Sequence, residues 1–481
     1  MINKKLIPLC IMILLVMSAQ GQHVRNSLEQ EIDRLVSDHT LVQGDFGLYV
    51  HDINDNRTVA AHQADKSLIP ASTQKILTTA YALQTLGENH TFKTELGYSG
   101  EIKGNTLHGN LIVKGFGDPA LLSNYHEEHY KNILDSWADS IKNKGIDTIT
   151  GSIIMDASYF GAYNTPPDWF WNDMGNYYGA SPFAINVEDN RFEVYFNSTA
   201  GAGNTTTITG TTAPYDITID NHVIGANTSR DMAYFYSAPL GEQIWAKGKI
   251  PQGQRQFIVK ASIPNPPKHL GMLLKQTLHR NGIVYTEEIE VEFNKSKSYN
   301  LLATQHSPKL IDIILTTNQR SHNLFAEALL LHLCKEKQID TNTQYAGEAL
   351  KLLMQQEGID LTGANIRDGS GLSRSNLITA KQMTEVLVAL SKDKEKWESF
   401  ISTLPKAGRE GSLASIFQNT SAVDRLVAKS GYLNKARSYS GFITTKSGKE
   451  ICFTLIANNY TCTAYQMKKK MERLMIQLCE L

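Results

Sequence analysis

Apolar and polar residues in the first part of the chain follow two different periods. Helical spacing over 27–37 predicts an amphipathic helix. Alternation with a period of two predicts a strand over Phe46–Ile53 and a returning strand over Thr58–His62, joined by an Asn-Asp-Asn turn. A further apolar helix is expected to begin after Pro70 and to end near Gly87. The chain is therefore predicted to open with a helix, a hairpin and a second helix.

The pattern changes from about residue 92 onwards and changes back after Pro308. Between these points short β-rich runs predominate, and a helix near 130–143 is the clearest exception. The later helices are expected over 309–316, 322–335, 343–357, 379–391 and about 464–479, and the strands over 425–433, 438–445 and 450–458. We therefore predict β-rich lobes, one or two, inserted over 92–300 into a discontinuous domain formed by 22–91 and 301–481.

The composition limits the possible functions without indicating one. The chain of 481 residues has 47 Lys and Arg against 48 Asp and Glu, and it has no charged block typical of nucleic-acid binding or disorder. Two lysines precede an apolar run over Leu6–Met17, and small or polar residues follow it. This layout is typical of a cleavable signal peptide, with cleavage after Ala19 or after Gly21, and the run is short for a membrane span. We therefore expect residues 1–21 to be removed on export.

The cysteines and histidines do not have the spacing of a metal site. No two cysteines form a Cys-x-x-Cys pair, so neither a zinc site nor a thioredoxin-like site is expected. Cys452 and Cys462 either pair in an oxidising compartment or remain buried thiols, and the sequence leaves both open. His126–His129 reads His-Glu-Glu-His, which lacks the spacing of a zinc motif and indicates a surface helix.

Ser72 and Lys75 form a Ser-x-x-Lys step at the start of the apolar helix after Pro70. Residues three apart are neighbours on a helix face, so an amine lies beside a hydroxyl. A hydroxyl needs such a base before it can attack a carbonyl group at neutral pH. A second copy, Ser391 with Lys394, lies in a charged run that is typical of a solvated helix face. The first copy is therefore the candidate for chemistry, provided that other residues complete it.

Ser321 and Asn323 open a second predicted helix. A hydroxyl and an amide two residues apart at a helix start can face one cleft, where the hydroxyl can relay a proton and the amide can hold a peptide group. The same Ser-x-Asn pattern at Ser298–Asn300 lies in a linker rich in Lys and Ser, with no helix after it. We therefore favour the copy at Ser321.

Lys429, Ser430 and Gly431 lie within a predicted strand. A lysine and a hydroxyl at the edge of a cleft can bind a carboxylate, and glycine lets a substrate backbone approach closely. A second Lys-Ser-Gly, at Lys446–Gly448, falls between two predicted strands and is interpreted as a hairpin turn that points into solvent. The copy on the strand is therefore preferred.

These three motifs, in this order and on these elements, are the signatures of penicillin-binding proteins and serine β-lactamases. With the long insertion between the first two motifs, the chain resembles the class C low-molecular-mass penicillin-binding proteins, the D-alanyl-D-alanine carboxypeptidase/endopeptidase family S13. Further matching stretches are Lys114–Pro119, Tyr177–Ala180, Asp368–Ser373 and Leu404–Gly408. The resemblance covers nearly the whole chain after the leader. It implies an α+β fold of the serine β-lactamase and transpeptidase type, in which helices flank an antiparallel sheet.

The resemblance also implies an acyl-enzyme mechanism without a metal or organic cofactor. Ser72 would be the nucleophile and Lys75 the base, with a pKa lowered by burial and by the charge of Lys429. Ser321 would pass protons to the leaving amine.

The remaining motif residues would bind the substrate. Asn323 would orient the acyl side, while Lys429 and Ser430 would hold the terminal carboxylate. The backbone N–H groups of Ser72 and Tyr432 would form the oxyanion hole.

Other residues near these motifs are interpreted as structural. His322 is expected to be a partly exposed spacer, and Glu327 to form an ion pair. Asp368–Ser373 is expected to be a turn-rich loop. Asp156, Trp169, Trp171 and Asp173 of the insertion could contact peptidoglycan, but the aromatic pair is more often part of the core of a lobe, so no role is assigned to it.

The implied substrates are peptidoglycan stem peptides, cleaved at D-Ala-D-Ala termini or at crosslinks between D-Ala and a diamino acid. β-Lactams would acylate the same serine, and the enzyme would be periplasmic, with peripheral membrane or cell-wall association left open. A β-lactamase or an esterase on the same fold is one alternative, although no deacylating glutamate motif is recognisable between Ser72 and Ser321. A catalytically silent peptidoglycan-binding module is another, although it would have no chemical need for the intact motif residues.

Overall fold

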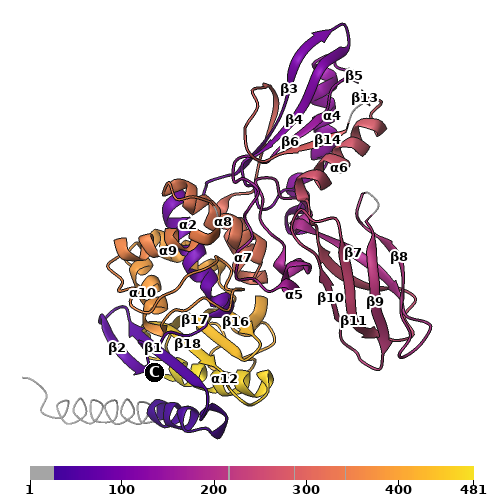
Figure 1. The fold of residues 1–481 in the computed structure, drawn as a ribbon. Coiled ribbons are helices and arrows are strands. Elements are labelled where there is room, and N and C mark those ends of the chain that lie inside the picture. The colour runs from indigo at the N-terminus through magenta and orange to yellow at the C-terminus, as the bar shows by residue number, and fades with distance from the viewer. Residues whose placement is uncertain (1–26, 215–216, 286–287, 342) are drawn as a thin grey trace, which may run out of the picture.

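The computed structural model describes residues 27–481 apart from 215–216, 286–287 and 342 (Figure 1). The predicted leader, residues 1–21, lies outside the described residues. Within the described part of the chain, no helix combines the length and the apolar character needed to cross a bilayer.

A five-stranded antiparallel sheet organises one half of the molecule, with the strand order β16-β17-β18-β1-β2. Its strands are β1 (Asp45–Asp52), β2 (Arg57–His62), β16 (Leu426–Leu433), β17 (Ala436–Thr444) and β18 (Glu450–Asn458). Because β1 pairs with β18 along its whole length, the two ends of the described chain meet in one sheet. The strand β16 lies at an edge of the sheet, where β17 is its only strand neighbour and a single bridge to Lys406 lies on its other side.

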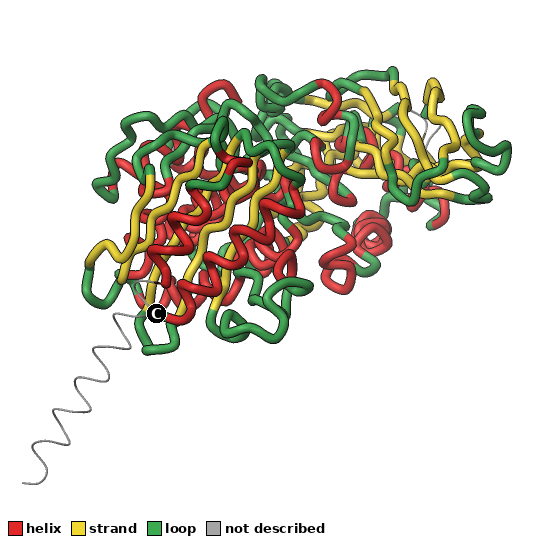
Figure 2. The backbone as a smooth tube through the Cα atoms, turned by 90° about the horizontal axis from the view of Figure 1, so that it is seen from below, coloured by secondary structure: helices red, strands yellow, loops and turns green. Residues whose placement is uncertain are grey.

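Helices cover both faces of this sheet, and we call the sheet with these helices the main module (Figure 2). On one face lie η2 (Ala71–Gln74), α2 (Lys75–Leu86), α7 (Leu310–Arg320), α8 (Asn323–Glu336), α9 (Thr343–Gln356), α10 (Ala380–Ser391) and α11 (Lys394–Thr403). On the other face lie a helix over 27–36 and α12 (Ala464–Glu480). Along β18, Cys452 and Ile456 face the first group while Phe453 and Leu455 face the second, as strand alternation requires. The expected α+β architecture is confirmed.

The insertion begins with a mixed sheet that we call the α/β lobe. Its strands are β3 (Lys93–Lys103), β4 (Thr106–Gly115), β5 (Thr148–Ile149), β6 (Ile153–Asp156), β13 (Val284–Tyr285), β14 (Ile289–Glu292) and β15 (Asn300–His306). The helices of this segment are α3 (Glu127–Tyr130), α4 (Ile133–Asn143) and α6 (Pro266–Arg280). Since β15 pairs with β3, the inserted sheet extends to His306, past the expected boundary at 300.

The helix α6 was not expected from the sequence. It begins with two prolines, which interrupt a helical pattern but are tolerated in the first turn, where the backbone N–H groups lack helical partners anyway. Asn265 caps this turn by accepting a hydrogen bond from the N–H of Lys268 at 3.0 Å.

A second lobe, which we call the β lobe, is nested inside the first. It contains β7 (Arg191–Asn197), β8 (Thr207–Thr211), β9 (Ile219–Ala226), β10 (Met232–Tyr236), β11 (Ile244–Pro251) and β12 (Phe257–Ser262). These strands form two three-stranded sheets, with the orders β12-β7-β8 and β10-β11-β9. Two short elements, α5 (Trp171–Met174) and η4 (Tyr177–Gly179), lead into this lobe from the α/β lobe.

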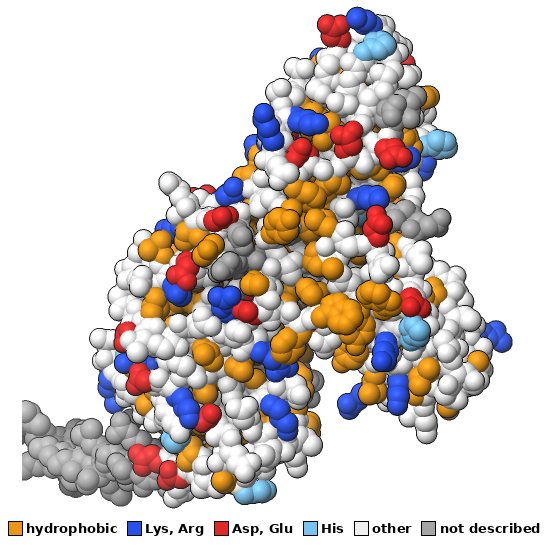
Figure 3. Space-filling model, in the orientation of Figure 1, with side chains coloured by type: hydrophobic (Ala, Val, Ile, Leu, Met, Phe, Trp, Pro, Cys, Tyr) orange, Lys and Arg blue, Asp and Glu red, His pale blue; other side chains and the backbone are white. Residues whose placement is uncertain are grey.

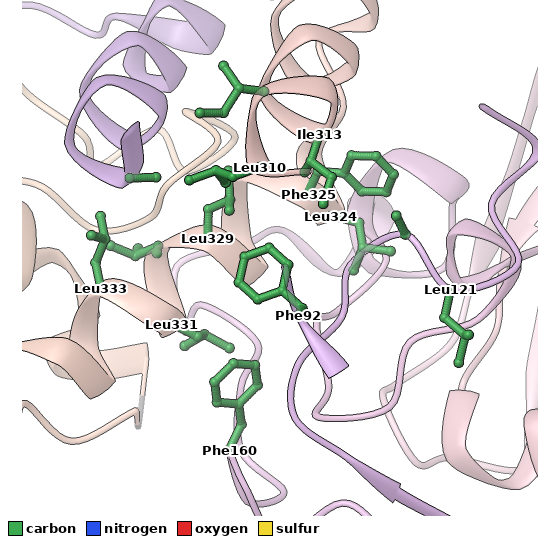
Figure 4. Packing of buried hydrophobic residues seen from close by; sticks show 14 of the residues in the cluster. Phe92, Leu121, Phe160, Leu310, Ile313, Leu324, Phe325, Leu329, Leu331 and Leu333 are labelled. Carbon is green, nitrogen blue, oxygen red and sulfur yellow. The ribbon is translucent and has the colours of Figure 1, made fainter. Parts of the chain in front are cut away.

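The two lobes differ in how they are anchored. Buried residues of the α/β lobe share one core with the main module, where Phe92 and Phe160 pack near Leu324 and Leu331 of α8 (Figure 4). The β lobe has a separate core of its own, which includes Phe235. The first lobe is therefore packed into the main module, whereas the second depends on its own interior.

Candidate active site

Ser72 and Lys75 lie where η2 continues into α2, as the sequence predicts. Lys75 is fully buried, and its Nζ lies 3.2 Å from Ser72 Oγ. The same Nζ donates to Asn323 Oδ1 at 2.6 Å and to the carbonyl oxygen of Ser370 at 2.7 Å. The amine thus has three contacts, and one of them is with the hydroxyl group of Ser72.

Burial lowers the pKa of Lys75 to about 7, against the opposing charges of Asp368 and Glu327. Burial and the positive charge of Lys75 also hold the pKa of Lys429 well below its usual value. We expected burial and the charge of Lys429 to lower the pKa of Lys75 together; burial is the largest cause at both lysines, and at Lys429 the charge of Lys75 adds to it. A fraction of Lys75 is therefore a free amine at neutral pH, as a base for Ser72 needs.

Ser321 and Asn323 lie on either side of the junction between α7 and α8. Ser321 ends α7 in the left-handed conformation, with φ of 56°, and α8 begins at Asn323. Ser321 Oγ accepts a hydrogen bond from Lys429 Nζ at 2.8 Å, and Asn323 Nδ2 donates to the carbonyl oxygen of Tyr178 at 2.7 Å. Ser321 is therefore placed beside Lys429, and Asn323 beside Lys75.

Lys429, Ser430 and Tyr432 lie on the edge strand β16. Lys429 is buried, Tyr432 is exposed, and Ser430 Oγ lies 2.8 Å from Ser412 Oγ. The N–H of Ala428 bonds to the carbonyl oxygen of Pro405, on the side of β16 away from β17. Because alternate residues of an antiparallel strand point their N–H groups the same way, those of Ser430 and Tyr432 also face this open edge. A donor for the predicted oxyanion hole is thus available at Tyr432.

Gly431 packs closely against the turn that carries Ser72. A Cβ at this position would lie 2.6 Å from the carbonyl oxygen of Pro70 and 3.0 Å from the backbone nitrogen of Ser72. In the structure this glycine admits the turn that carries Ser72, and the expected approach of a substrate backbone stays a prediction. The absence of a side chain thus brings the Ser72 turn against β16, next to Tyr432.

Two acidic residues that support Lys75, Glu327 and Asp368, were interpreted from the sequence only as structural. Glu327, on α8, accepts hydrogen bonds from the N–H groups of Gly369 and Ser370 at 3.1 and 2.7 Å. Burial and the charge of Asp368 raise the pKa of Glu327 to about 8. The expected ion pair of Glu327 is thus replaced by contacts with a loop, and that loop presents the Ser370 carbonyl to Lys75.

Asp368 organises the same loop from within. Its carboxylate accepts hydrogen bonds from the backbone of Gly371 and Ser373, from the side chain of Asn376 and from Trp169 Nε1 at 2.9 Å. A side chain at Gly371, where φ is 80°, would collide with the carbonyl group of Ala71, next to Ser72. The loop over 368–376 therefore backs both Ser72 and Lys75.

The insertion also contacts the site. Trp169 is buried, as expected for a core residue, whereas Trp171 is 56% exposed, contrary to that expectation. His322 is not a simple spacer, because its side chain caps α8 and its Nε2 lies 3.5 Å from Asp189 of the insertion. Of the aromatic pair, Trp169 therefore supports the loop through Asp368, while Trp171 lies on the surface.

The second copies of the motifs lie away from these contacts. The side chain of Lys394 is 88% exposed, and Lys446 is exposed in the turn between β17 and β18. Asn300 begins the strand β15 instead of a helix. In each case the copy that the sequence favours is the one that lies with the other motif residues, which we call the catalytic cluster.

The described residues contain no group of three or more His, Cys, Asp and Glu side chains arranged to hold a metal ion. The cysteines of the same residues, Cys334, Cys452, Cys462 and Cys479, are free thiols. Of the two readings that the sequence left open for Cys452 and Cys462, the structure has the unpaired one.

Helices flank an antiparallel sheet, and a serine, two buried lysines and an asparagine gather at one end of its edge strand. This combination defines a serine hydrolase of the penicillin-binding type. The chain belongs to the D-Ala-D-Ala carboxypeptidase 3 (S13) family, whose family model matches residues 28–478.

Individual relatives agree with this family. D-alanyl-D-alanine carboxypeptidase DacB of Haemophilus influenzae is 27% identical over 430 residues, which are 88% of this chain and 87% of the relative. The D-alanyl-D-alanine carboxypeptidase of an Actinomadura species is 26% identical over 461 residues, 90% of this chain and 81% of the relative. The crystal structure of penicillin binding protein 4 from Haemophilus influenzae matches with a TM-score of 0.81 and 24% identity, covering 95% of this chain and 99% of that one. This last match supports the fold.

Proposed function

We propose that this chain is a serine DD-peptidase that cleaves peptidoglycan stem peptides through an acyl-enzyme on Ser72. It acts as a carboxypeptidase on D-Ala-D-Ala termini and as an endopeptidase on crosslinks between D-Ala and a diamino acid. The observation that carries the proposal is the buried amine of Lys75, which lies 3.2 Å from Ser72 Oγ and has a pKa of about 7. The family membership supports the substrate class.

Acylation begins when Ser72 transfers its proton to the free amine of Lys75 and its Oγ attacks the carbonyl carbon of the penultimate D-Ala. The backbone N–H groups of Ser72 and Tyr432 stabilise the oxyanion that forms. When this intermediate collapses, the peptide bond breaks, and the leaving amine takes, through Ser321, the proton that Lys75 had accepted, which leaves Lys75 a free amine again. A water molecule then gives one proton to Lys75 as its oxygen attacks the acyl carbon. When the ester bond breaks, that proton passes to Ser72 Oγ, the acyl product leaves as a carboxylic acid, and the enzyme is restored.

Substrate binding is proposed to use the open edge of β16. Lys429 and Ser430 hold the terminal carboxylate of the substrate, and Ser321, which already bonds to Lys429, lies between this pair and the reacting bond. Asn323 positions Lys75 through Oδ1, and its Nδ2 exchanges the Tyr178 carbonyl group for the acyl side of the substrate.

We also propose that the protein is exported and works in the periplasm, where its substrate lies. The basic and apolar layout of residues 1–21 supports this location. β-Lactams acylate Ser72 in the same way as substrate, because their strained amide occupies the position of the scissile bond.

The test combines three readouts on the mature protein. D-Alanine should be released from a stem pentapeptide, a crosslinked dimer should be cleaved, and a fluorescent penicillin should form a stable adduct. All three should be lost in Ser72→Ala and kept in Ser391→Ala, which removes the second copy of the motif. Rapid turnover of the penicillin would indicate a β-lactamase instead, and an adduct that persists in Ser72→Ala would exclude Ser72 as the nucleophile.

A further inference from the structure

One face of the β lobe exposes aromatic rings that its core does not use. Along β10, Ala233 and Phe235 point inward and are buried, while Tyr234 is 41% exposed. Along β11, Trp245 is 37% exposed and Lys247 lies on the same face two residues later. These residues are cross-strand neighbours, because Tyr234 pairs with Lys247 and Tyr236 pairs with Trp245.

Trp171 extends this face towards the active site. Its ring centroid lies 5.1 Å from that of Tyr236 and 6.1 Å from that of Trp245. We call Trp171, Tyr234, Tyr236 and Trp245 the aromatic track. Rings clustered on a surface cost free energy in water, and such a patch usually marks an interaction site.

The track is continuous with the active site along the chain and in space. Trp171 begins α5, and four residues after that helix ends, the carbonyl oxygen of Tyr178 accepts its hydrogen bond from Asn323. In Figure 1, β10 and β11 lie on the side of the β lobe that faces the main module, and Figure 3 shows a hollow between these two parts. Whatever binds to the track therefore lies in the same hollow as the edge strand β16.

We propose that the aromatic track binds the glycan strand of peptidoglycan, so that a stem peptide attached to that strand can reach Ser72. The proposal rests on the proposed function, since it places the polymer whose peptides the enzyme cleaves. Sugar rings present C–H groups on their faces, and these stack on the electron-rich faces of aromatic rings. The hydroxyl groups of Tyr234 and Tyr236 meet the polar edges of the sugars.

The charge of the face fits the same ligand. Lys247 and Lys249 follow Trp245 on the exposed side of β11. Peptidoglycan carries carboxylates on its stem peptides, next to its sugars, so a row of rings beside a row of amines matches its alternation of apolar and anionic groups. Lysine is depleted from the cores of protein–protein interfaces, and this argues against a second copy of the chain as the occupant. A planar bilayer cannot enter a hollow between two modules, whereas a single strand can.

The test compares two substrates that differ only in the sugar. Tyr234→Thr with Trp245→Thr removes two rings and keeps residues that favour strands. We expect this double variant to lose about tenfold in kcat/KM on stem pentapeptides attached to soluble glycan chains. It should keep the wild-type kcat/KM on the sugar-free pentapeptide, because neither residue belongs to the catalytic cluster. Tyr465→Ala, an exposed ring on α12, is the matched control and should change neither value.

Three other results would contradict the inference or the proposed function. Equal kcat/KM values for the double variant and the wild type on the glycan-linked substrate would overturn the inference. A wild-type protein inactive on both substrates would instead overturn the proposed function. If the double variant lost binding to anionic phospholipid vesicles, or changed its sedimentation from dimer to monomer, while keeping its kcat/KM on glycan, the track would be a membrane or dimer surface and the inference would be wrong.

Discussion

At the scale of single residues, the contacts of Lys75 suit both of its protonation states. The charged form donates one N–H to each of Ser72 Oγ, Asn323 Oδ1 and the Ser370 carbonyl oxygen. The neutral form has only two N–H donors, which Asn323 and Ser370 can accept, and its lone pair is then free to face the hydroxyl of Ser72. The protonated form has no lone pair and cannot accept the proton of Ser72. The ionisation of one side chain therefore controls acylation.

Because acylation needs the neutral form of Lys75, its rate should depend on pH. The rate constant for acylation by a fluorescent penicillin should rise with pH as Lys75 loses its proton, with a midpoint near the pKa of about 7. Below the midpoint Lys75 is charged and the rate should fall tenfold per pH unit. A profile that stays flat across neutral pH would exclude Lys75 as the base.

A second prediction concerns the close packing at Gly431. In Gly431→Ala the new methyl group meets Ser438 Oγ, the carbonyl oxygen of Pro70 and the backbone nitrogen of Ser72. The hydroxyl of Ser438 can rotate, but the backbone cannot, so the Ser72 turn must move away from β16. Because such a displacement can cost on the order of 100-fold, we expect a loss of that size in the acylation rate constant. Gly210→Ala is the control, since its Cβ meets only the ring of Tyr195, at 3.6 Å. An unchanged rate in Gly431→Ala would mean that the turn tolerates the shift.

At the scale of elements, the loop over 368–376 acts as a support for α2. It has no regular secondary structure, and the carboxylate of Asp368 accepts hydrogen bonds from three donors within it and from Trp169 of the insertion. Asp368→Asn replaces an acceptor with an amide that points N–H groups at other donors. We expect the free energy of unfolding to fall by about 1–3 kcal/mol, measured with urea, together with slower acylation.

The control for this substitution is Asp360→Asn. Asp360 accepts hydrogen bonds from Thr362 at the surface, where water can replace them. The free energy of unfolding of this variant should stay at the wild-type value, because the substitution removes no buried contact. Equal effects at the two positions would argue against a special role for the loop.

Most regular elements of the main module were predictable, because their periods are strong, but α11 was not among the expected helices and α7 continues to Arg320, past its expected end at 316. The strands β16 and β18 and the helices α8, α10 and α12 lie within two residues of the predicted ranges. The supporting roles of Glu327 and Asp368 were not predictable, since a buried acceptor that bonds to a distant backbone leaves no periodic trace in the sequence. The motif residues were found because order and element type distinguished them from their second copies, and their catalytic roles remain predictions.

At the scale of the whole molecule, the two lobes differ in how they should unfold. Phe160 of the α/β lobe packs against His332 of α8, at 5.1 Å between ring centroids, inside the shared core. Phe160→Ala should therefore destabilise the main module by about 3–5 kcal/mol, and penicillin labelling should be lost in the same urea transition as the helical circular dichroism.

Phe235→Ala is the matched substitution in the separate core of the β lobe. We expect it to unfold the β lobe at lower urea, seen by tryptophan fluorescence, while penicillin labelling persists to a higher concentration. A single common transition for this variant would mean that the two cores unfold together. The sequence did not predict this difference, because the placement of the nested lobe depends on contacts between residues far apart in the chain.

The edge of β16 also bears on how the protein avoids self-association. An unpaired strand edge is a template on which another chain can add a strand, and this is a common route to aggregation. Here the first half of β16 is covered, because Val427 forms a bridge with Lys406 and Ala428 bonds to Pro405. Only the half from Ser430 to Tyr432 stays open, next to Ser72. The fold thus leaves open a stretch of edge long enough for a short peptide but too short to recruit a foreign sheet.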